Sequence, residues 1–144
     1  MNVLLKAVKG YALLVITIFI LGWLFIGLVA SGSNETTTYS ESDVFKYHTL
    51  TDKDIENAPR ITNNYHFEAH PGDGYAPSNS IIFKGVSKVA PLRAYLEQLG
   101  YTKEKRHPGD KEIWSKPGHP EGDLFYLYFN TVTKEAELTK VLNN

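Results

Sequence analysis

Three near copies of one short motif contain most of the histidines in this chain. The motif is His-Pro-Gly-Asp at residues 70–73 and 107–110, and it recurs as His-Pro-Glu-Gly-Asp at residues 119–123. Imidazole nitrogens and carboxylate oxygens are the usual non-thiolate ligands of zinc and similar ions, so three copies brought together would form a metal site. The same residues also build reverse turns, because Pro-Gly sets the turn dihedral angles and the aspartate bonds nearby backbone amides.

The spacing of the histidines favours turns over a metal site. A strand predicted over residues 111–115 separates His107 from His119 by about 16 Å, at about 3.3 Å per residue. His66 and His70 would face one ion on a helix, but their neighbours alternate as in a strand, which places them about 13 Å apart. We therefore expect turns and a solvated strand face. A divalent-metal-binding domain or metal-dependent enzyme built on these four histidines is kept as an alternative.

The sequence contains no other recognisable constellation for catalysis or cofactor binding. The absence of cysteine excludes thiolate catalysis, zinc–thiolate sites, disulfides and a lipidated cysteine. There is no Gly-x-Ser-x-Gly elbow, no Gly-x-Gly-x-x-Gly motif and no Walker loop. We expect no catalytic residue, no cofactor and no resident metal, and hence a protein that is not an enzyme.

An aromatic strand, predicted over residues 124–130 with the sequence LFYLYFN, is the best candidate for a binding surface. Both of its faces are largely apolar, which is typical of a central strand covered on both sides. Tyr126 and Tyr128 share one face, and with Tyr101 or Trp114 beside them they form the candidate partner surface. The alternative is that the other face of the strand meets a helix and the tyrosines pack under a loop.

The remaining pattern after residue 42 is that of strands around one main helix. Apolar residues three and four apart predict that helix over residues 87–99, with Gly100 ending it. A short helix is expected at residues 52–57. Residues 135–142 suit a strand or a helix, and we prefer the strand. Strands are expected at residues 61–69, 80–84, 101–106, 111–115, 124–130 and 136–142.

The N-terminal stretch predicts where the protein resides. Residues 11–30 contain no charge and no proline, and as a helix they would run about 30 Å, the thickness of a bilayer's hydrocarbon core. Lys6 and Lys9 precede this stretch and Lys46 is the first basic residue after it, so the positive-inside rule keeps the N-terminus in the cytoplasm. A signal peptide cleaved after Gly32 is the alternative. Because such peptides have apolar regions of about 7–15 residues, we expect a retained anchor.

These expectations divide the chain into four parts. Residues 1–10 form a short cytoplasmic N-terminus, residues 11–30 the single transmembrane helix and residues 31–42 a flexible tether. Residues 43–144 form a small extracytoplasmic domain of the α+β class, with two layers in which one main helix covers antiparallel strands. Acidic residues slightly outnumber basic ones, so the concentrated basic face that nucleic acid requires is not expected.

The function expected from the sequence is that of a single-pass, membrane-anchored, non-catalytic protein. Its partners would be the lipid bilayer, through residues 11–30, and another protein or an envelope component outside the cytoplasm, in the periplasm of a Gram-negative cell. Inhibitor or immunity-like roles belong to this class. Besides the metal-site alternative, a small accessory subunit that joins a membrane complex through its transmembrane helix remains open.

Overall fold

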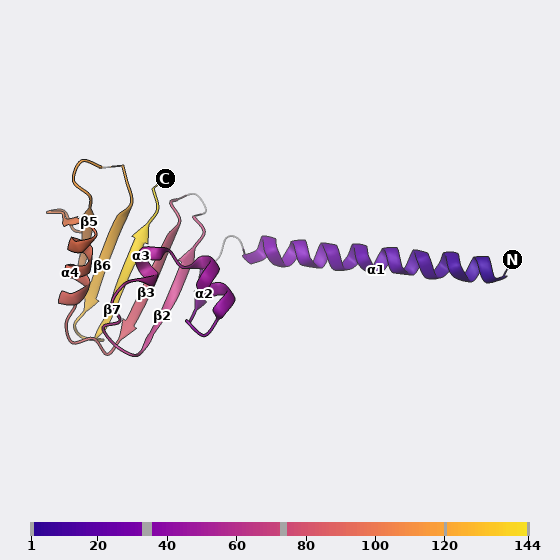
Figure 1. Cartoon of the computed structure of the whole chain (residues 1–144), viewed down its shortest axis with the longest axis horizontal. Coiled ribbons are helices and arrows are strands. Elements are labelled where there is room, and N and C mark those ends of the chain that lie inside the picture. Colours follow the sequence, from indigo (N-terminus) through magenta and orange to yellow (C-terminus); the bar gives the residue numbers. More distant parts are fainter. Residues whose placement is uncertain (1, 33–35, 73–74, 120, 144) are drawn as a thin grey trace. The chain divides into compact units, whose positions relative to one another are not determined.

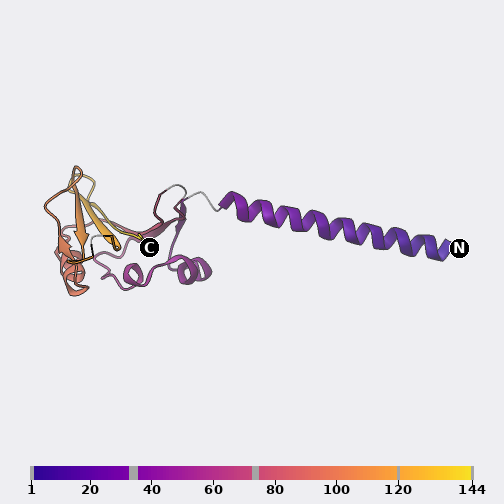
Figure 2. The same cartoon turned by 90° about the horizontal axis from the view of Figure 1, so that it is seen from above.

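The computed structural model describes residues 2–32, 36–72, 75–119 and 121–143. It divides the chain into two compact units, Met1–Glu35 and Thr36–Asn144. Among the residues in these ranges, those of the first unit form one helix, and the strands belong to the second unit (Figure 1, Figure 2). The strands and short helices of the second unit confirm the predicted α+β class.

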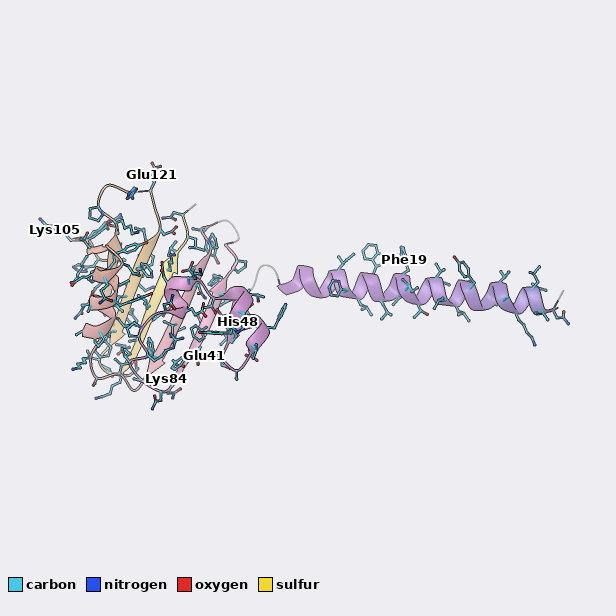
Figure 3. The ribbon with its side chains drawn as sticks, in the orientation of Figure 1. Phe19, Glu41, His48, Lys84, Lys105 and Glu121 are labelled. Carbon is cyan, nitrogen blue, oxygen red and sulfur yellow. The ribbon has the colours of Figure 1, made fainter. Side chains whose placement is uncertain are left out.

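The first unit is helix α1, which spans Asn2–Gly32. Helix α1 begins earlier than the predicted residues 11–30, since Leu, Ala and Lys near the N-terminus are good helix formers and nothing interrupts them. Its part Asn2–Ile26 is long and apolar enough to cross a membrane, and a signal sequence would meet the same criteria. The described side chains of α1, including Phe19, are exposed (Figure 3).

The second unit is built on a seven-stranded antiparallel sheet with the strand order β1-β2-β3-β7-β6-β5-β4. Strand β7 therefore lies in the middle of the sheet, between β6, which directly precedes it in sequence, and the distant β3. The strands are β1 (Thr37–Tyr39), β2 (Tyr65–His70), β3 (Ser78–Lys84), β4 (Thr102–Lys103), β5 (Lys111–Ser115), β6 (Leu124–Asn130) and β7 (Glu135–Val141). The predicted strand for the C-terminal residues, preferred over a helix, is confirmed.

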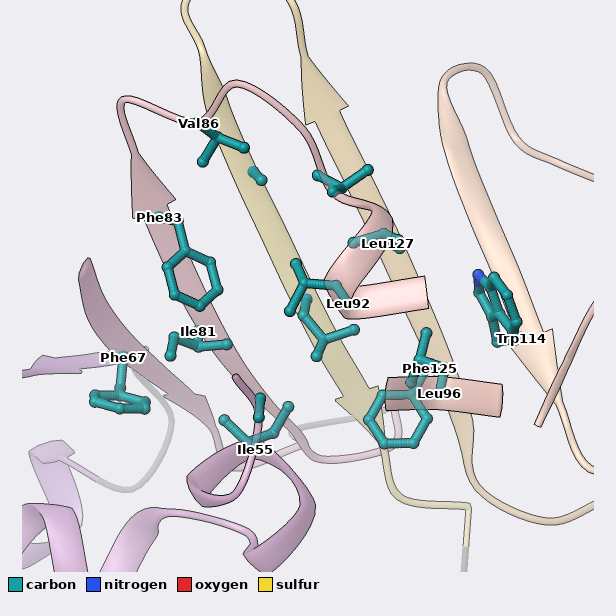
Figure 4. Close-up of a cluster of buried hydrophobic side chains, with 14 of the residues drawn as sticks. Ile55, Phe67, Ile81, Phe83, Val86, Leu92, Leu96, Trp114, Phe125 and Leu127 are labelled. Atoms are coloured by element: carbon teal, nitrogen blue, oxygen red, sulfur yellow. The ribbon is translucent and has the colours of Figure 1, made fainter. Parts of the chain in front are cut away.

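All the described helices of the second unit lie on one face of this sheet, which we call the core face (Figure 2). They are α2 (Val44–Leu50), α3 (Lys53–Glu56) and α4 (Ala90–Gln98). Leu92 and Leu96 of α4 and Ile55 of α3 are fully buried against the sheet (Figure 4). The largest buried side chains of the strands on this face are Phe67, Ile81, Phe83, Phe125, Leu127 and Leu138.

Helix α4 ends as the sequence predicts, and its end directs the next residue into the core. Gly100 has a φ of +89°, which a residue with a side chain rarely adopts. Its amide donates to the carbonyl of Glu97 at 3.0 Å, and the amide of Tyr101 donates to that of Leu96 at 3.0 Å. These two hydrogen bonds are those of a Schellman motif. The reversed chain packs Tyr101 edge-on against Phe125, with the ring centroids 4.8 Å apart.

Two elements have no counterpart in the sequence prediction. Strand β1 lies inside the predicted tether of residues 31–42, because three residues are too few to show a strand pattern. It is recognisable only through its pairing with β2 and through Tyr39, whose ring stacks on Phe67 with centroids 5.5 Å apart. The first residues of the predicted tether, 33–35, lie outside the described residues.

Helix α2 is the second element without a counterpart in the sequence prediction. It buries no residue, so its sequence shows no apolar stripe that would have predicted it.

Leu138→Ala is expected to lower the free energy of unfolding of the second unit by about 2–5 kcal/mol. Leu138 lies in the central strand, fully buried between its register partners Ile81 and Leu127, so truncation leaves a cavity. Urea unfolding of the full chain in detergent, followed by near-UV circular dichroism, measures the change. Val132→Ala is the control, because Val132 is 89% exposed and its loss should cost less than about 0.5 kcal/mol. Equal losses for the two variants would contradict the assigned core.

Candidate functional site

The face of the sheet opposite the helices has no helix over it in the described part of the chain (Figure 2). We call it the open face. Strand alternation places Tyr126 and Tyr128 of β6 there, together with side chains of β3, β5 and β7 that pair with them in register. The central residues of the open face are Ser80, Ile82, Ile113, Tyr126, Tyr128, Glu137 and Thr139.

Two isoleucines form an apolar centre on the open face. Ile82 is 3% and Ile113 is 6% exposed, yet neither belongs to the buried cluster on the core face. Ile82 pairs in register with Glu137, and Ile113 pairs with Tyr126. Both tyrosines of the face are half-buried. Because the two isoleucines are buried beneath their neighbours, the surface that the open face presents is that of the tyrosines and the polar side chains around them.

Hydrogen bonds organise the polar side chains between these isoleucines. The hydroxyls of Ser80 and Thr139 are 2.7 Å apart, and Thr139 donates to Glu137 Oε1 at 3.1 Å. Because Thr139 uses its proton on Glu137, the Ser80 hydroxyl is the donor to Thr139. The result is a fixed row of polar groups across β3 and β7, ending in a carboxylate that accepts further hydrogen bonds.

Charged pairs border the open face on both sides. At the β4 side, Ser115 donates to Glu104 Oε1 at 3.0 Å, and Arg106 pairs with the same carboxylate. The hydrogen bond from Arg106 lowers the pKa of Glu104, so this carboxylate is ionised at neutral pH. At the β2 side, His66 Nε2 lies 3.8 Å from Glu68 Oε1. The face thus combines an apolar centre with a charged margin.

The structure divides the four residues of the predicted partner surface between the two faces. Tyr126 and Tyr128 lie on the open face, whereas Tyr101 and Trp114 are buried on the core face. Trp114 pairs in register with Phe125, and its indole Nε1 donates to a carboxylate on the same strand at 3.2 Å. In the described part of the chain, helices cover strand β6 on its core face, while Tyr126 and Tyr128 are half-buried on the open face.

Sequence reasoning missed the isoleucines of the open face, although the sequence contains a signal for them. Ile82 follows Ile81, and Ile113 precedes Trp114. Adjacent strand residues point to opposite faces, so only one of each pair can enter the same core. Two strands with such pairs indicate that both faces of the sheet carry apolar side chains.

The four histidines of the metal-site alternative are separated in the structure. His70 contacts the Thr36 hydroxyl through Nε2 and the Tyr75 hydroxyl through Nδ1 at 3.2 Å. His107 donates from Nδ1 to the carbonyl of Gly109 at 2.9 Å within its turn. His119 follows the opposite end of β5. Within the ranges that the structure describes, no group of three or more His, Asp or Glu side chains is arranged to hold a metal ion.

A buried lysine forms the strongest electrostatic feature of the second unit. Lys140 of β7 points to the core face beside Phe125, with its Nζ 6.0 Å from the ring centroid. The same Nζ lies 3.1 Å from Asp52 Oδ1, 2.8 Å from Asp54 Oδ2 and 3.8 Å from Asp123 Oδ2. Burial opposes the charged form, but the hydrogen bonds with Asp54 and Asp52 outweigh it and raise the pKa of Lys140. An amine held protonated in this way is unsuited to nucleophilic catalysis.

Further hydrogen bonds fix the aspartates around Lys140. The Asp52 side chain caps α3 by accepting from the Asp54 amide at 2.9 Å, and the Asp52 amide donates to Asn79 Oδ1 at 2.8 Å. Tyr95 donates to the Asp54 carbonyl at 2.6 Å. Burial, with the nearby charges of Asp54 and Asp52, raises the pKa of Tyr95 to about 12. This cluster ties α3 and α4 to β7, and every contact in it serves packing.

A groove of about 460 Å³ near the end of β6 is a second concave candidate, lined partly by Arg93, Glu112 and Tyr128. Arg93 holds Glu112 by two nitrogens, with Nη2 at 2.6 Å and Nε at 3.1 Å. Burial alone would raise the pKa of Glu112, but the hydrogen bond from Arg93 prevails and lowers it. Since Trp114 donates to the same carboxylate, Glu112 is engaged by the chain itself, and the pair links α4 to β5.

Comparison with protein-family models, with curated proteins and with solved structures finds no match to this chain. The functional argument therefore depends on the residues and geometry of the molecule itself. Among its described features, the exposed apolar helix α1 and the open face are both suited to contacts outside the chain.

Lys140→Met is expected to lower the free energy of unfolding by about 3 kcal/mol at neutral pH, because three carboxylates lose their cation. Lys105→Met, which replaces an exposed lysine (Figure 3), is the matched control. Urea unfolding of the full chain in detergent measures both. An equal loss in the two variants would contradict a stabilising role for the cluster.

The stability of the second unit is expected to decrease at alkaline pH. The pKa values of Tyr95 and Lys140 are raised in the folded state from 10.0 and 10.5. Their contribution is therefore complete below about pH 10 and is lost as the pH rises through the folded values. Urea unfolding at a series of pH values measures this loss. Tyr95→Phe should make the alkaline decrease shallower and Tyr75→Phe should not, so identical pH profiles would contradict the assignment.

Proposed function

We propose that this protein is a single-pass, membrane-anchored, non-catalytic protein whose second unit binds another protein through the open face, outside the cytoplasm. The observation that carries the proposal is helix α1. All described side chains from Asn2 to Ile26 are exposed, and most of them are apolar. Nothing in the described chain buries that surface, and a lipid bilayer is the environment that would.

The distribution of basic residues supports the proposed orientation. Lys6 and Lys9 lie near the N-terminal end of α1, and the next basic residue along the chain is Lys46. Basic residues next to a transmembrane helix favour the cytoplasmic side. The short N-terminal end then stays in the cytoplasm and the second unit is translocated.

The composition of the open face supports a protein as the partner of the second unit. Tyrosine is enriched at the centres of protein interfaces because its ring contributes apolar area and its hydroxyl forms hydrogen bonds. Tyr126 and Tyr128 lie there beside Ile113, and Glu137 offers an acceptor in the same row. A small surface of two tyrosines with charged pairs at its margin suits a reversible partner, since obligate interfaces are larger and more apolar.

We expect the membrane fraction to contain the full-length chain. We also expect a reporter fused after the last residue to be active only outside the cytoplasm. Intact mass and reporter activity measure this. Leu14→Arg should reduce the membrane-bound fraction, because a charge in mid-span costs about 2.5–3.5 kcal/mol. Lys9→Arg preserves the charge pattern and is the control. A soluble product that starts after Gly32 would show a cleaved signal peptide, and an active reporter in the cytoplasm would refute the orientation.

A photo-reactive phenylalanine analogue at position 126 is expected to give one discrete adduct in native membranes. The substitution replaces one aromatic ring by another on the open face. Adding Tyr128→Ala should weaken the adduct about tenfold, since losing an interface tyrosine costs on the order of 1–2 kcal/mol. The same analogue at the exposed Val132 is the control. No adduct from position 126, or the same adduct from position 132, would contradict the proposed surface.

A further inference from the structure

We infer that helix α2 of the anchored protein rests on the outer surface of the bilayer and inserts Phe45 and Val44 among the lipid headgroups. The inference rests on the proposed function, because only a chain held by α1 keeps α2 beside a membrane. The partner is the lipid surface itself, and the contact would orient the second unit relative to the bilayer.

The first observation is the exposure of apolar side chains on α2. Phe45 is 80% and Val44 is 63% exposed, and none of the seven residues of the helix is buried. Only Tyr47 turns toward the core, where its ring lies 5.3 Å from that of Phe67. At about 100° per residue, Val44, Phe45 and the exposed His48 (Figure 3) share the outward side of the helix.

The second observation is the shortness of the connection to α1. Helix α1 ends at Gly32, and the second unit begins at Thr36. Four residue steps reach at most about 14 Å, even fully extended. Strand β1 and helix α2 follow at once, so Val44 is twelve residues from the end of α1. If α1 spans the bilayer, twelve residues keep Val44 within about 42 Å of the end of α1 even when fully extended, so the headgroups are within reach of α2.

Both signs of charge lie around the apolar pair: two lysines, and the exposed carboxylate of Asp43, whose Oδ2 accepts from the Ser40 amide at 3.2 Å. Lys46 lies next to Phe45 and is exposed, and Lys53 at the start of α3 is exposed as well. Lysine side chains beside inserted apolar residues reach the phosphates of anionic headgroups. The nearby Glu41 is paired with Arg60 at 2.8 Å, which reduces its repulsion of those phosphates.

The size of the patch favours lipid over a protein partner. A stable protein interface buries about 800 Å² on each side and involves about 20–30 residues, far more than two side chains of a seven-residue helix provide. A weak lipid contact is sufficient here because the short connection keeps the effective concentration of the surface high. Apolar side chains of interfacial helices typically insert about 5–10 Å.

A spin label on α2 tests this inference in the full chain. The protein has no cysteine, so Thr49→Cys can be labelled uniquely, one turn after Phe45. The chain is reconstituted in vesicles of phosphatidylcholine and phosphatidylglycerol in equal amounts, and collisions with oxygen and with a water-soluble nickel complex are measured. We expect oxygen collisions to predominate, as for a label at headgroup depth. Phe45→Ser should reverse this ratio, whereas Val132→Ser, at another exposed apolar residue, should leave it unchanged.

A second label separates failure of this inference from failure of the proposed anchor. A spin label at Leu14→Cys reports whether α1 lies in lipid. If that label is accessible to the nickel complex, the anchor itself is refuted, and the inference with it. If the Leu14 label lies in lipid but the Thr49 label collides mainly with nickel, or does not respond to Phe45→Ser, only the inference is overturned. A Thr49 label shielded from both reagents would indicate a protein partner and would also overturn it.

Discussion

The alternation of side chains along the strands is the constraint on which the second unit depends. Each strand directs successive residues to opposite faces, while the described helices lie on one face alone. Ile81 and Ile82 are therefore separated by the sheet, one entering the helix-covered core and the other the open face. The core face accounts for folding, and the open face retains apolar side chains that no helix covers. The same strands thus supply both the folding core and the surface to which we assign the proposed partner.

The position of the last strand gives the unit its connectivity. Strand β7 is the last strand in sequence order, yet it lies between β3 and β6, so it joins the two halves of the sheet. Lys140 reinforces this arrangement by contacting Asp52, 88 residues away, and Asp54 at the start of α3. Such long-range contacts are typical of domains that fold slowly and cooperatively.

Three exposed features are left after folding, and each suits a different environment. Helix α1 is apolar around its circumference, the open face is a mixed surface that presents the half-buried Tyr126 and Tyr128, and α2 presents Phe45 beside lysines. A bilayer, a protein and a headgroup layer are the environments in which such surfaces are stable. The short connection between the two units makes the first and third contacts compatible with one another. Together they support the proposal of a small binding module held close to a membrane.

The local sequence pattern was sufficient to predict an element wherever the neighbours of a residue in sequence decide its environment. The sequence alone determined the apolar helix, the end of α4 at Gly100, the strands 111–115 and 124–130 with their bounds, and the C-terminal strand. Only the tertiary structure decided that Thr37–Tyr39 is a strand, that α2 is a helix with no buried residue, and that Trp114 and Tyr101 face the core. The reason is physical: an edge strand is defined by its partner, and the face a side chain occupies depends on strand register. Both are set by contacts between residues far apart in the chain.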